Sequence, residues 1–326
     1  MKRLLLLSGL FMISLLVACS SSSTDKDNAS AKEEGETVSD EGVYSLENDG
    51  VDEKKFQEDL EQFPENIPER VITTSVPITE MLQLLDITPV GVPTSTNPIP
   101  EEFSEIDQIG SPMEPDLEVV THLEPDLIIG ATSLKDTLED RLSGIELDRA
   151  YLKTDSFEDL KRSFKALGTY FDKTEEMNEV LEEILSLEND LIQQAEGKDL
   201  PSVLLMIGTA DSFMVMSEDS YVGSLVEKLG AENIASTALQ ATETYSPMNI
   251  EDVVVADPDI IFVLASGDHG ASENMFEEEV QKNDIWKSLS AYENDTIHIL
   301  DYDIFGVTSI QNVSRAMTEL ADYFFE

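Results

Sequence analysis

The feature that most constrains the fold is an internal repeat. Residues 116–129 read DLEVVTHLEPDLII, and residues 249–262 read NIEDVVVADPDIIF. Each copy has a glutamate at its third position, then apolar residues, then an acidic residue, proline and aspartate before an apolar run. Agreement at so many positions indicates the duplication of one helix–turn–strand unit. The chain is therefore expected to fold into two lobes of similar build.

Each copy lies within a series of alternating strands and helices. In the first lobe, residues 70–155, we expect strands at 70–76, 89–92, 108–110 and 126–130, and helices at 78–85 and 114–122. In the second lobe, residues 200–326, we expect strands at 201–208, 259–264 and 296–300, and a helix at 221–229. Alternation of this kind predicts an α/β protein with Rossmann-like lobes and mostly parallel central sheets.

The segment between the lobes, residues 156–197, has a different composition. Residues 156–196 contain no proline and one glycine, Gly168, and residues with high helix propensity dominate them. Leu181, Ile184, Leu185 and Leu191 recur at helical spacing. We therefore expect one long, rigid helix that joins the two lobes.

The amino terminus has the pattern of an exported lipoprotein. Lys2 and Arg3 precede an apolar run over residues 4–17 that is too short for a permanent membrane span, which predicts a signal peptide over residues 1–18. The run ends in Leu-Val-Ala-Cys, which resembles the lipobox of bacterial lipoproteins, and Cys19 is the only cysteine. We expect the Cys19 thiol to carry a lipid anchor, and no disulfide or thiolate metal site remains possible.

Residues 19–66 are rich in Ser, Asp, Glu, Gly and Asn, which predicts a disordered acidic tether; only residues 51–63 are compatible with a short amphipathic helix. The whole chain has 68 acidic and 20 basic side chains and a formal charge of −48. Such a balance excludes a general nucleic-acid surface, because phosphates require a basic footprint.

These features together resemble the substrate-binding proteins of iron-chelate, cobalamin and haem ABC importers, in which a rigid helix joins two lobes. Within that class, the chain resembles the haem-receptor lipoproteins of the iron-regulated surface determinant system of Gram-positive bacteria. The segments that carry this resemblance are 109–116, 219–226, 230–234, 269–270, 282–287 and 305–308.

The resemblance implies that the ligand is haem, iron protoporphyrin IX, with Met113 and His269 as the axial ligands of its iron. Imidazole nitrogen and thioether sulfur are both established iron ligands. Both residues follow predicted strands, where open α/β sheets place their ligand crevice. His269 lies in a polar loop flanked by glycines rather than on an apolar face.

Haem propionates require hydrogen-bond donors. Thr74, Ser75 and Val76 precede a predicted helix, whose free amides suit an anionic group. Ser95 and Thr96 belong to a second polar loop on the same predicted face. The family carries a tyrosine and a lysine in this second loop, and both are missing from this chain.

Glu118 and Glu251 occupy equivalent positions in the two copies of the repeat. In the family, one glutamate from each lobe docks onto arginines of the permease. The resemblance thus implies a monomeric, lipid-anchored protein on the outer face of the cell membrane. Its partners would be an ABC permease and haem donor proteins of the cell wall.

Other functions fit the residues less well. A zinc or manganese receptor would require several histidines and carboxylates at one site, whereas the three histidines are scattered over the chain. The chain also has no phosphate-binding glycine loop and no nucleophile elbow, which argues against an enzyme. A ferric siderophore or cobalamin is the leading alternative ligand, because the same fold serves all three.

Overall fold

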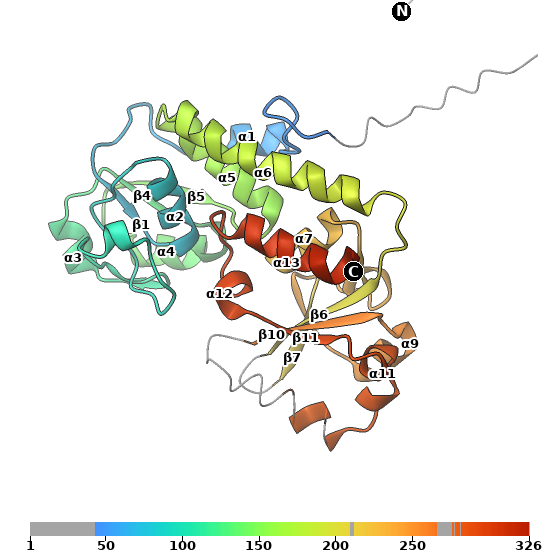
Figure 1. Ribbon diagram of the computed structural model, residues 1–326. Coiled ribbons are helices and arrows are strands. Elements are labelled where there is room, and N and C mark those ends of the chain that lie inside the picture. The colour runs from blue at the N-terminus through green and yellow to red at the C-terminus, as the bar shows by residue number, and fades with distance from the viewer. Residues whose placement is uncertain (1–42, 209–211, 266–275, 277, 281, 326) are drawn as a thin grey trace, which may run out of the picture. The chain divides into compact units, whose positions relative to one another are not determined.

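The computed structural model describes residues 43–208, 212–265, 276, 278–280 and 282–325 (Figure 1). Residues 42–326 form one compact unit. The predicted signal peptide, Cys19 and His269 lie outside the described residues. Within the described part of the chain, no helix combines the length and the apolar character that crossing a membrane would require.

The first lobe is built on a parallel sheet in the order β1–β4–β5, as the alternating pattern predicts. Its strands are largely buried, which parallel strands require because helices cover their faces. The elements in chain order are β1 (Val71–Thr73), α2 (Val76–Leu84), η1 (Glu101–Phe103), β2 (Gly110–Ser111), β3 (Glu114–Pro115), α3 (Leu117–His122), β4 (Leu127–Ala131), η2 (Thr132–Leu134), α4 (Lys135–Arg141) and β5 (Asp148–Leu152).

The second lobe has a larger, mixed sheet in the order β11–β10–β6–β7–β9, with β8 paired to β6. The pairs β6–β10, β10–β11 and β6–β8 are parallel, whereas β6–β7 and β7–β9 are antiparallel. Its described elements are β6 (Ser202–Gly208), β7 (Phe213–Met216), α7 (Tyr221–Lys228), β8 (Glu232–Asn233), α8 (Ile234–Thr237), β9 (Tyr245–Pro247), α9 (Ile250–Ala256), β10 (Ile260–Ala265), η3 (Trp286–Ser288), α11 (Ser290–Glu293), β11 (Ile297–Leu300), α12 (Tyr302–Phe305) and α13 (Val313–Phe325).

Two of the predicted strands in the first lobe are not regular strands. Residues 89–92 and 108–110 are held by isolated bridges, Ile72 to Gly91 and Val92 to Gln108. The prolines on both sides of residues 90–92 have no backbone N–H to donate to a ladder. Pairing therefore stops after single residues, and the chain instead forms the short antiparallel pair β2–β3.

The connecting segment consists of two helices, α5 (Phe157–Tyr170) and α6 (Thr174–Ala195), where the sequence predicted one. Between them Asp172 has a φ of 58°, and the Lys173 amide donates to the Gly168 carbonyl (2.8 Å), a helix-ending turn. A Cβ on Gly168 would lie 2.6 Å from the Cβ of Met177, so this glycine permits α5 and α6 to approach closely.

The prediction of a disordered tether up to residue 66 is wrong for residues 43–66, whereas the short helix expected within residues 51–63 is confirmed. Helix α1 (Glu53–Leu60) packs on α5, and Phe56 and Phe63 are buried. Carboxylates that suggested disorder form ion pairs with basic side chains of α5: Asp59 with Arg162 (2.8 Å) and Asp49 with Lys165 (2.5 Å). Composition cannot reveal such pairing, because the partners lie about a hundred positions away.

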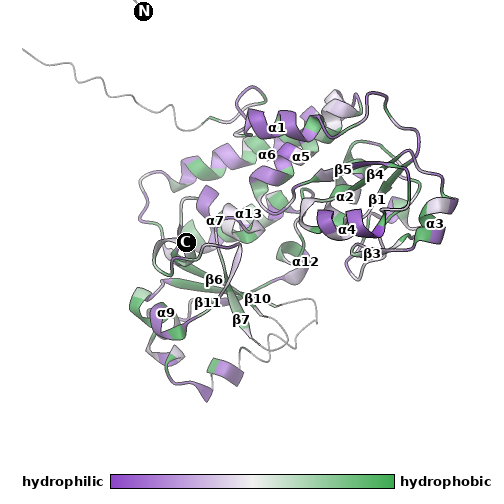
Figure 2. Cartoon of the chain, turned by 180° about the vertical axis from the view of Figure 1, so that it is seen from behind, coloured by the Kyte–Doolittle hydropathy of each residue, from purple (hydrophilic) through white to green (hydrophobic). Residues whose placement is uncertain are grey.

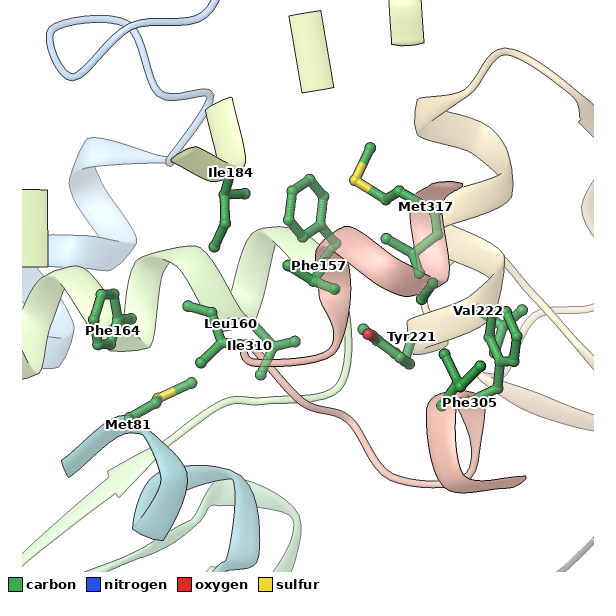
Figure 3. Close-up of a cluster of buried hydrophobic side chains, with 14 of the residues drawn as sticks. Met81, Phe157, Leu160, Phe164, Ile184, Tyr221, Val222, Phe305, Ile310 and Met317 are labelled. Carbon is green, nitrogen blue, oxygen red and sulfur yellow. The ribbon is translucent and has the colours of Figure 1, made fainter. Parts of the chain in front are cut away.

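The lobes share one hydrophobic core with the connecting helices. Met81 of α2 lies near Leu160 and Phe164 of α5, and residues of the second lobe such as Tyr221 and Ile310 complete the cluster (Figure 3). Figure 2 shows the contrast between the hydrophobic strands β6 and β10 and the largely hydrophilic helix α1.

A buried ionic network adds to this core. Lys161 of α5 is fully buried and pairs with Glu188 of α6 (3.1 Å) and with Glu158 (3.0 Å). Lys228 of α7 contacts the same two carboxylates, at 2.6 Å from Glu158 and 3.1 Å from Glu188. Because removing one partner would leave a buried charge, the network fixes α7 to the connecting helices.

Candidate ligand-binding site

A cavity of about 280 Å³ is bordered by residues of both lobes. The first lobe contributes α2 and the loop after residue 93, and the second lobe contributes α12 and the segment between α12 and α13. Helix α2 follows the carboxyl end of β1, which is where open α/β sheets bind ligands. The lining residues are Val76, Glu80, Asn97, Pro98, Tyr302, Asp303, Val307, Ser309 and Asn312.

The amino terminus of α2 meets this cavity at Val76. Ser75 is the N-cap residue, but its side chain makes no capping hydrogen bond, and Pro77 lies at the start of the helix. The Thr79 amide and hydroxyl both donate to the Ser75 carbonyl, at 2.9 and 2.8 Å. The helix is therefore held in place without use of the Ser75 hydroxyl, and its positive end faces the cavity wall.

Glu80 is the buried acid of the cavity. It lies one turn after Val76 on α2, is 9% exposed, and accepts a hydrogen bond from the Ser309 hydroxyl (2.7 Å) across the lobe boundary. Burial raises the pKa of Glu80 to about 7, and the Ser309 bond opposes that shift only in part. A second bond between the lobes, from the Gln311 amide to the Gln83 side chain (2.5 Å), lies one turn further along α2.

Met113 lies at the tip of the β2–β3 hairpin and is 61% exposed. Gly110, with a φ of 94°, makes the hairpin possible, since a Cβ there would lie 2.9 Å from the Glu114 carbonyl. Arg141 of α4 forms an ion pair with Glu114 (2.8 Å). The thioether is thus presented by a turn whose base is fixed, although Met113 is not among the residues that line the cavity.

The polar loop 94–97 contacts this hairpin. The Thr94 amide donates to the Gly110 carbonyl (2.8 Å), and the Thr94 hydroxyl donates to Gln108 (3.1 Å). Further along, the Ser95 hydroxyl accepts from the Asn97 amide (3.0 Å), and Asn97 reaches the cavity. The loop therefore joins the hairpin of Met113 to the cavity, with Thr96 exposed between them.

The three residues predicted at the start of α2 differ in exposure. Val76 lines the cavity, and Ser75 is the N-cap, with 6% of its surface exposed. Thr74 is fully buried, and its hydroxyl has no hydrogen-bond partner among the described residues. A Cβ on Gly130 of β4 would lie 2.9 Å from the Thr74 hydroxyl, so this hydroxyl lies against β4, and Thr74 is not among the residues that line the cavity.

Glu118 and Glu251 are exposed at matching positions, each as the second residue of its helix. The N-cap Asp116 accepts from the Glu118 amide (2.9 Å), and the N-cap Asn249 accepts from the Glu251 amide (3.1 Å). Both caps hold the backbone amide of the glutamate, whose side chain is exposed. No hydrogen bond or ion pair restrains either carboxylate in the described part of the chain.

Sequence reasoning missed Glu80, Ser309 and Asn312. A signal for Glu80 did exist, because a glutamate at position 80 falls on the same helical face as Val76 and among apolar neighbours. For Ser309 and Asn312 no such signal exists, since their role depends on the contact of α2 with a segment more than two hundred residues away.

Comparison with known proteins agrees with this geometry. The family model for periplasmic binding proteins matches residues 71–303. The chain is 30% identical over 258 residues to the high-affinity heme uptake system protein IsdE of Staphylococcus aureus, covering 79% of this chain and 87% of that protein. The structure of S. aureus IsdE complexed with heme superposes with a TM-score of 0.71, covering 79% of this chain and 99% of that one.

Two further structures widen the comparison. An ABC transporter substrate-binding protein from Listeria monocytogenes EGD-e is 32% identical, with a TM-score of 0.72 over 80% of this chain and 99% of that chain. S. aureus SirA complexed with staphyloferrin B is 21% identical, with a TM-score of 0.66 over 80% and 94%, and shares the fold. From the family match and the extent of these similarities, the chain belongs to the periplasmic binding protein family.

Proposed function

We propose that this protein binds haem outside the cell and delivers it to an ABC permease. The observation that carries the proposal is the exposed Met113 on a braced hairpin, in a chain 30% identical to a heme uptake protein. One solved structure that resembles this chain, with a TM-score of 0.71, is a heme complex. This similarity supports haem as the ligand class.

In this proposal, Met113 of the first lobe and His269 of the second lobe hold the haem iron. Thioether and imidazole are both suitable axial ligands, and the pair favours the reduced metal. The β2–β3 turn fixes Met113 without burying it, so its sulfur remains accessible to a ligand between the lobes.

The propionates would meet neutral donors. Ser75 and Val76 would bring the amino terminus of α2, and Ser95 and Thr96 would bring the polar loop, while Thr74 beside Ser75 is fully buried. The cavity between α2 and α12 has no lysine or arginine among its lining residues. Helix amides and neutral side-chain donors would therefore bind the propionates in place of lysine or arginine side chains.

Delivery would use Glu118 and Glu251, which the repeat places at matching helix starts, one in each lobe. Two equivalent carboxylates suit a permease of two similar subunits, because each can contact an equivalent basic group. The Cys19 thiol would be acylated, cleavage of the signal peptide would make Cys19 the new amino terminus, and its lipid would hold the protein on the outer face of the membrane.

The test is a haem titration of the chain from residue 20 onward, followed by absorption spectroscopy. We expect saturation at one haem per chain with a low-spin spectrum of a histidine–methionine pair. Met113→Leu and His269→Gln should each change that spectrum. Met248→Leu and His122→Gln are the matched controls, because they remove the same groups at a second-lobe position and on α3, and should leave the spectrum unchanged.

A flat haem titration would contradict the proposal. Ferric siderophores and cobalamin would then be titrated against the same chain, with intrinsic fluorescence as the signal. Haem binding that is indifferent to both Met113→Leu and His269→Gln would preserve haem as the ligand but overturn the assignment of the iron ligands.

A further inference from the structure

Glu80 lies in the cavity wall and has no part in the proposed ligation of iron by Met113 and His269. It is the buried carboxyl of the cavity, bonded to Ser309 of the opposite lobe at 2.7 Å. An ionised carboxylate with a single neutral donor is costly to bury, whereas the neutral acid keeps that bond and gains a hydrogen-bond donor of its own. The protein therefore favours neutral Glu80 at a wall that faces the ligand.

Among the described residues, no cation near Glu80 reverses this preference. Across the cavity α12 presents Tyr302 and Asp303, and from α7 comes Tyr221, whose phenol pKa is raised first by burial and then by the charge of Glu80. The faces of α5 and α6 towards α2 carry apolar side chains such as Leu160 and Ile184 (Figure 3). The causes of the raised pKa of Glu80 are burial and, in opposition, the Ser309 bond.

The chemistry of the cavity matches an anionic group that is held by neutral donors. Asn97 and Asn312 line the cavity, the Asn312 side-chain amide has a second hydrogen beside the one that it donates to the Asp303 carbonyl (3.2 Å), and Val76 marks the positive end of α2. The polar loop 94–97, Thr-Ser-Thr-Asn, carries no tyrosine and no basic side chain. A carboxylate placed here needs one more donor, and the O–H of neutral Glu80 is available on the same wall.

We propose that Glu80, as a neutral acid, donates a hydrogen bond to a carboxylate of the ligand, so that affinity falls when Glu80 ionises. The inference rests on the proposed haem function, in which the carboxylate is a propionate. Glu80 is then a ligand-positioning residue that makes haem capture sensitive to pH.

The direction of the effect follows from linkage. A ligand carboxylate beside Glu80 favours the protonated form, so binding raises the pKa of Glu80 above that of the free protein. Well below pH 7 both states are protonated and affinity does not change on account of this group. Above pH 7 the free protein loses its proton first, and affinity falls by up to tenfold per pH unit.

The experiment compares haem affinity of the wild type and Glu80→Gln at pH 6, 7.5 and 9, by competition with apomyoglobin. The ratio of the wild-type affinity to the Glu80→Gln affinity is used at each pH, because the effects of pH on haem and on the competitor cancel in it. Glutamine keeps the size and the acceptor for Ser309, and it remains a donor at every pH. We expect the ratio of wild-type to Glu80→Gln affinity to fall by up to about fourfold between pH 6 and 7.5, and by up to about twentyfold more between pH 7.5 and 9.

Glu105→Gln is the matched control, since it removes an exposed carboxyl that does not line the cavity and should retain the wild-type pH dependence. Ser309→Ala provides a second variant: loss of its bond favours neutral Glu80, so the fall should begin at a higher pH. A constant ratio, or a ratio that rises with pH, would overturn the role of Glu80 while haem binding stands. Failure of the wild type and of every variant to bind haem would overturn the proposed function as well.

Discussion

Helices α2 and α7 occupy equivalent places in the two lobes but differ where they face a ligand. Each lies between the first strand of its lobe and the copy of the repeat, and each begins after a serine. Ser220 caps α7 by accepting from the Gly223 amide (3.1 Å), whereas Ser75 makes no such bond at α2. One turn into the helix, α7 has the buried Leu225, and α2 has Glu80.

The two copies of the repeat show the opposite behaviour. Val120 and Val253 are both fully buried, and Glu124 and Asp257 both have a φ of 44°. At the start of each strand an aspartate accepts from the backbone of the neighbouring strand: Asp126 from Arg70 (3.0 Å) and Asp259 from Ser202 (2.9 Å). Groups that shape the backbone thus recur in both lobes, and groups that face the cavity differ.

The largest expected effect separates α2 from α7 through the charge of Glu80. The ordinary pKa of 4.5 is raised to about 7 in the folded protein, so folding favours the protonated form. The stabilisation is complete below pH 4.5 and is lost as the pH rises to 7, a difference of about 3 kcal/mol. Relative to the wild type, Glu80→Gln should therefore gain about 3 kcal/mol in free energy of unfolding between pH 4.5 and pH 8.

Denaturant unfolding of both proteins at several pH values measures this gain. Glu105→Gln removes an exposed carboxylate near η1 and should show almost none of it. If the difference in unfolding free energy between Glu80→Gln and the wild type does not vary with pH, Glu80 is ionised in the folded protein. The comparison of α2 with α7 would then hold for the shape of the side chains and not for the protonation of Glu80.

Glu118 and Glu251, the residues proposed to dock onto the permease, test whether the two lobes are equivalent in function. If Glu118 and Glu251 contact equivalent groups of the permease, each glutamine variant should lower haem-dependent uptake by about tenfold, and the double variant by about a hundredfold. Asp252→Asn, beside Glu251 on α9, is the control, and haem affinity should not change in any variant. A large effect from only one of the two glutamates would show that the permease distinguishes the lobes.

A smaller effect concerns the turns that end α3 and α9, which have different supports. In the first lobe the Arg70 guanidinium donates to the Leu123 carbonyl (2.5 Å) and the Glu124 carbonyl (3.1 Å). In the second lobe the Asp257 carboxylate accepts from the Ser290 amide (2.8 Å) and hydroxyl (2.7 Å).

Arg70→Ala should cost about 1.5 kcal/mol of unfolding free energy, because it leaves two carbonyls without their donor. Ser290→Ala should cost about 0.5 kcal/mol, because its amide bond to Asp257 remains. Thermal unfolding of both variants measures the difference, and equal losses would contradict it.

The sequence was sufficient to predict the features that repeat or alternate. The equal spacing of Glu118 and Glu251 from their prolines predicted two similar units, and the apolar runs located β4, β6 and β10 within one or two residues. It was insufficient where a structure depends on distant partners. Asp49 and Asp59 suggested a tether until their pairing with α5 was seen, and the break at Asp172 requires only one residue with a left-handed backbone.

The candidate site divides in the same way. Val76 lies at the wall of the cavity, while its assignment to the haem propionates stays a prediction. Thr74 belongs to the same run of polar residues, yet it is fully buried, and sequence alone cannot distinguish adjacent side chains that point in opposite directions. Glu80 and Ser309 meet only because α2 contacts the second lobe.

The smallest expected effect concerns the backbone of the repeat itself. Glu124 and Asp257 share a φ of 44°, a conformation that costs most residues about 1 kcal/mol and glycine almost nothing. Glu124→Gly should therefore stabilise the protein by about 0.5 kcal/mol, because its carbonyl can still accept from Arg70. Asp257→Gly relieves the same strain but removes the acceptor of both Ser290 bonds, so its net effect should be destabilising.

Denaturant unfolding with Asp257→Asn as the reference distinguishes the two contributions, since asparagine tolerates the conformation and keeps one acceptor. Stabilisation by both glycine variants would mean that strain outweighs the Ser290 bonds, and that the two turns are equivalent in energy as well as in shape.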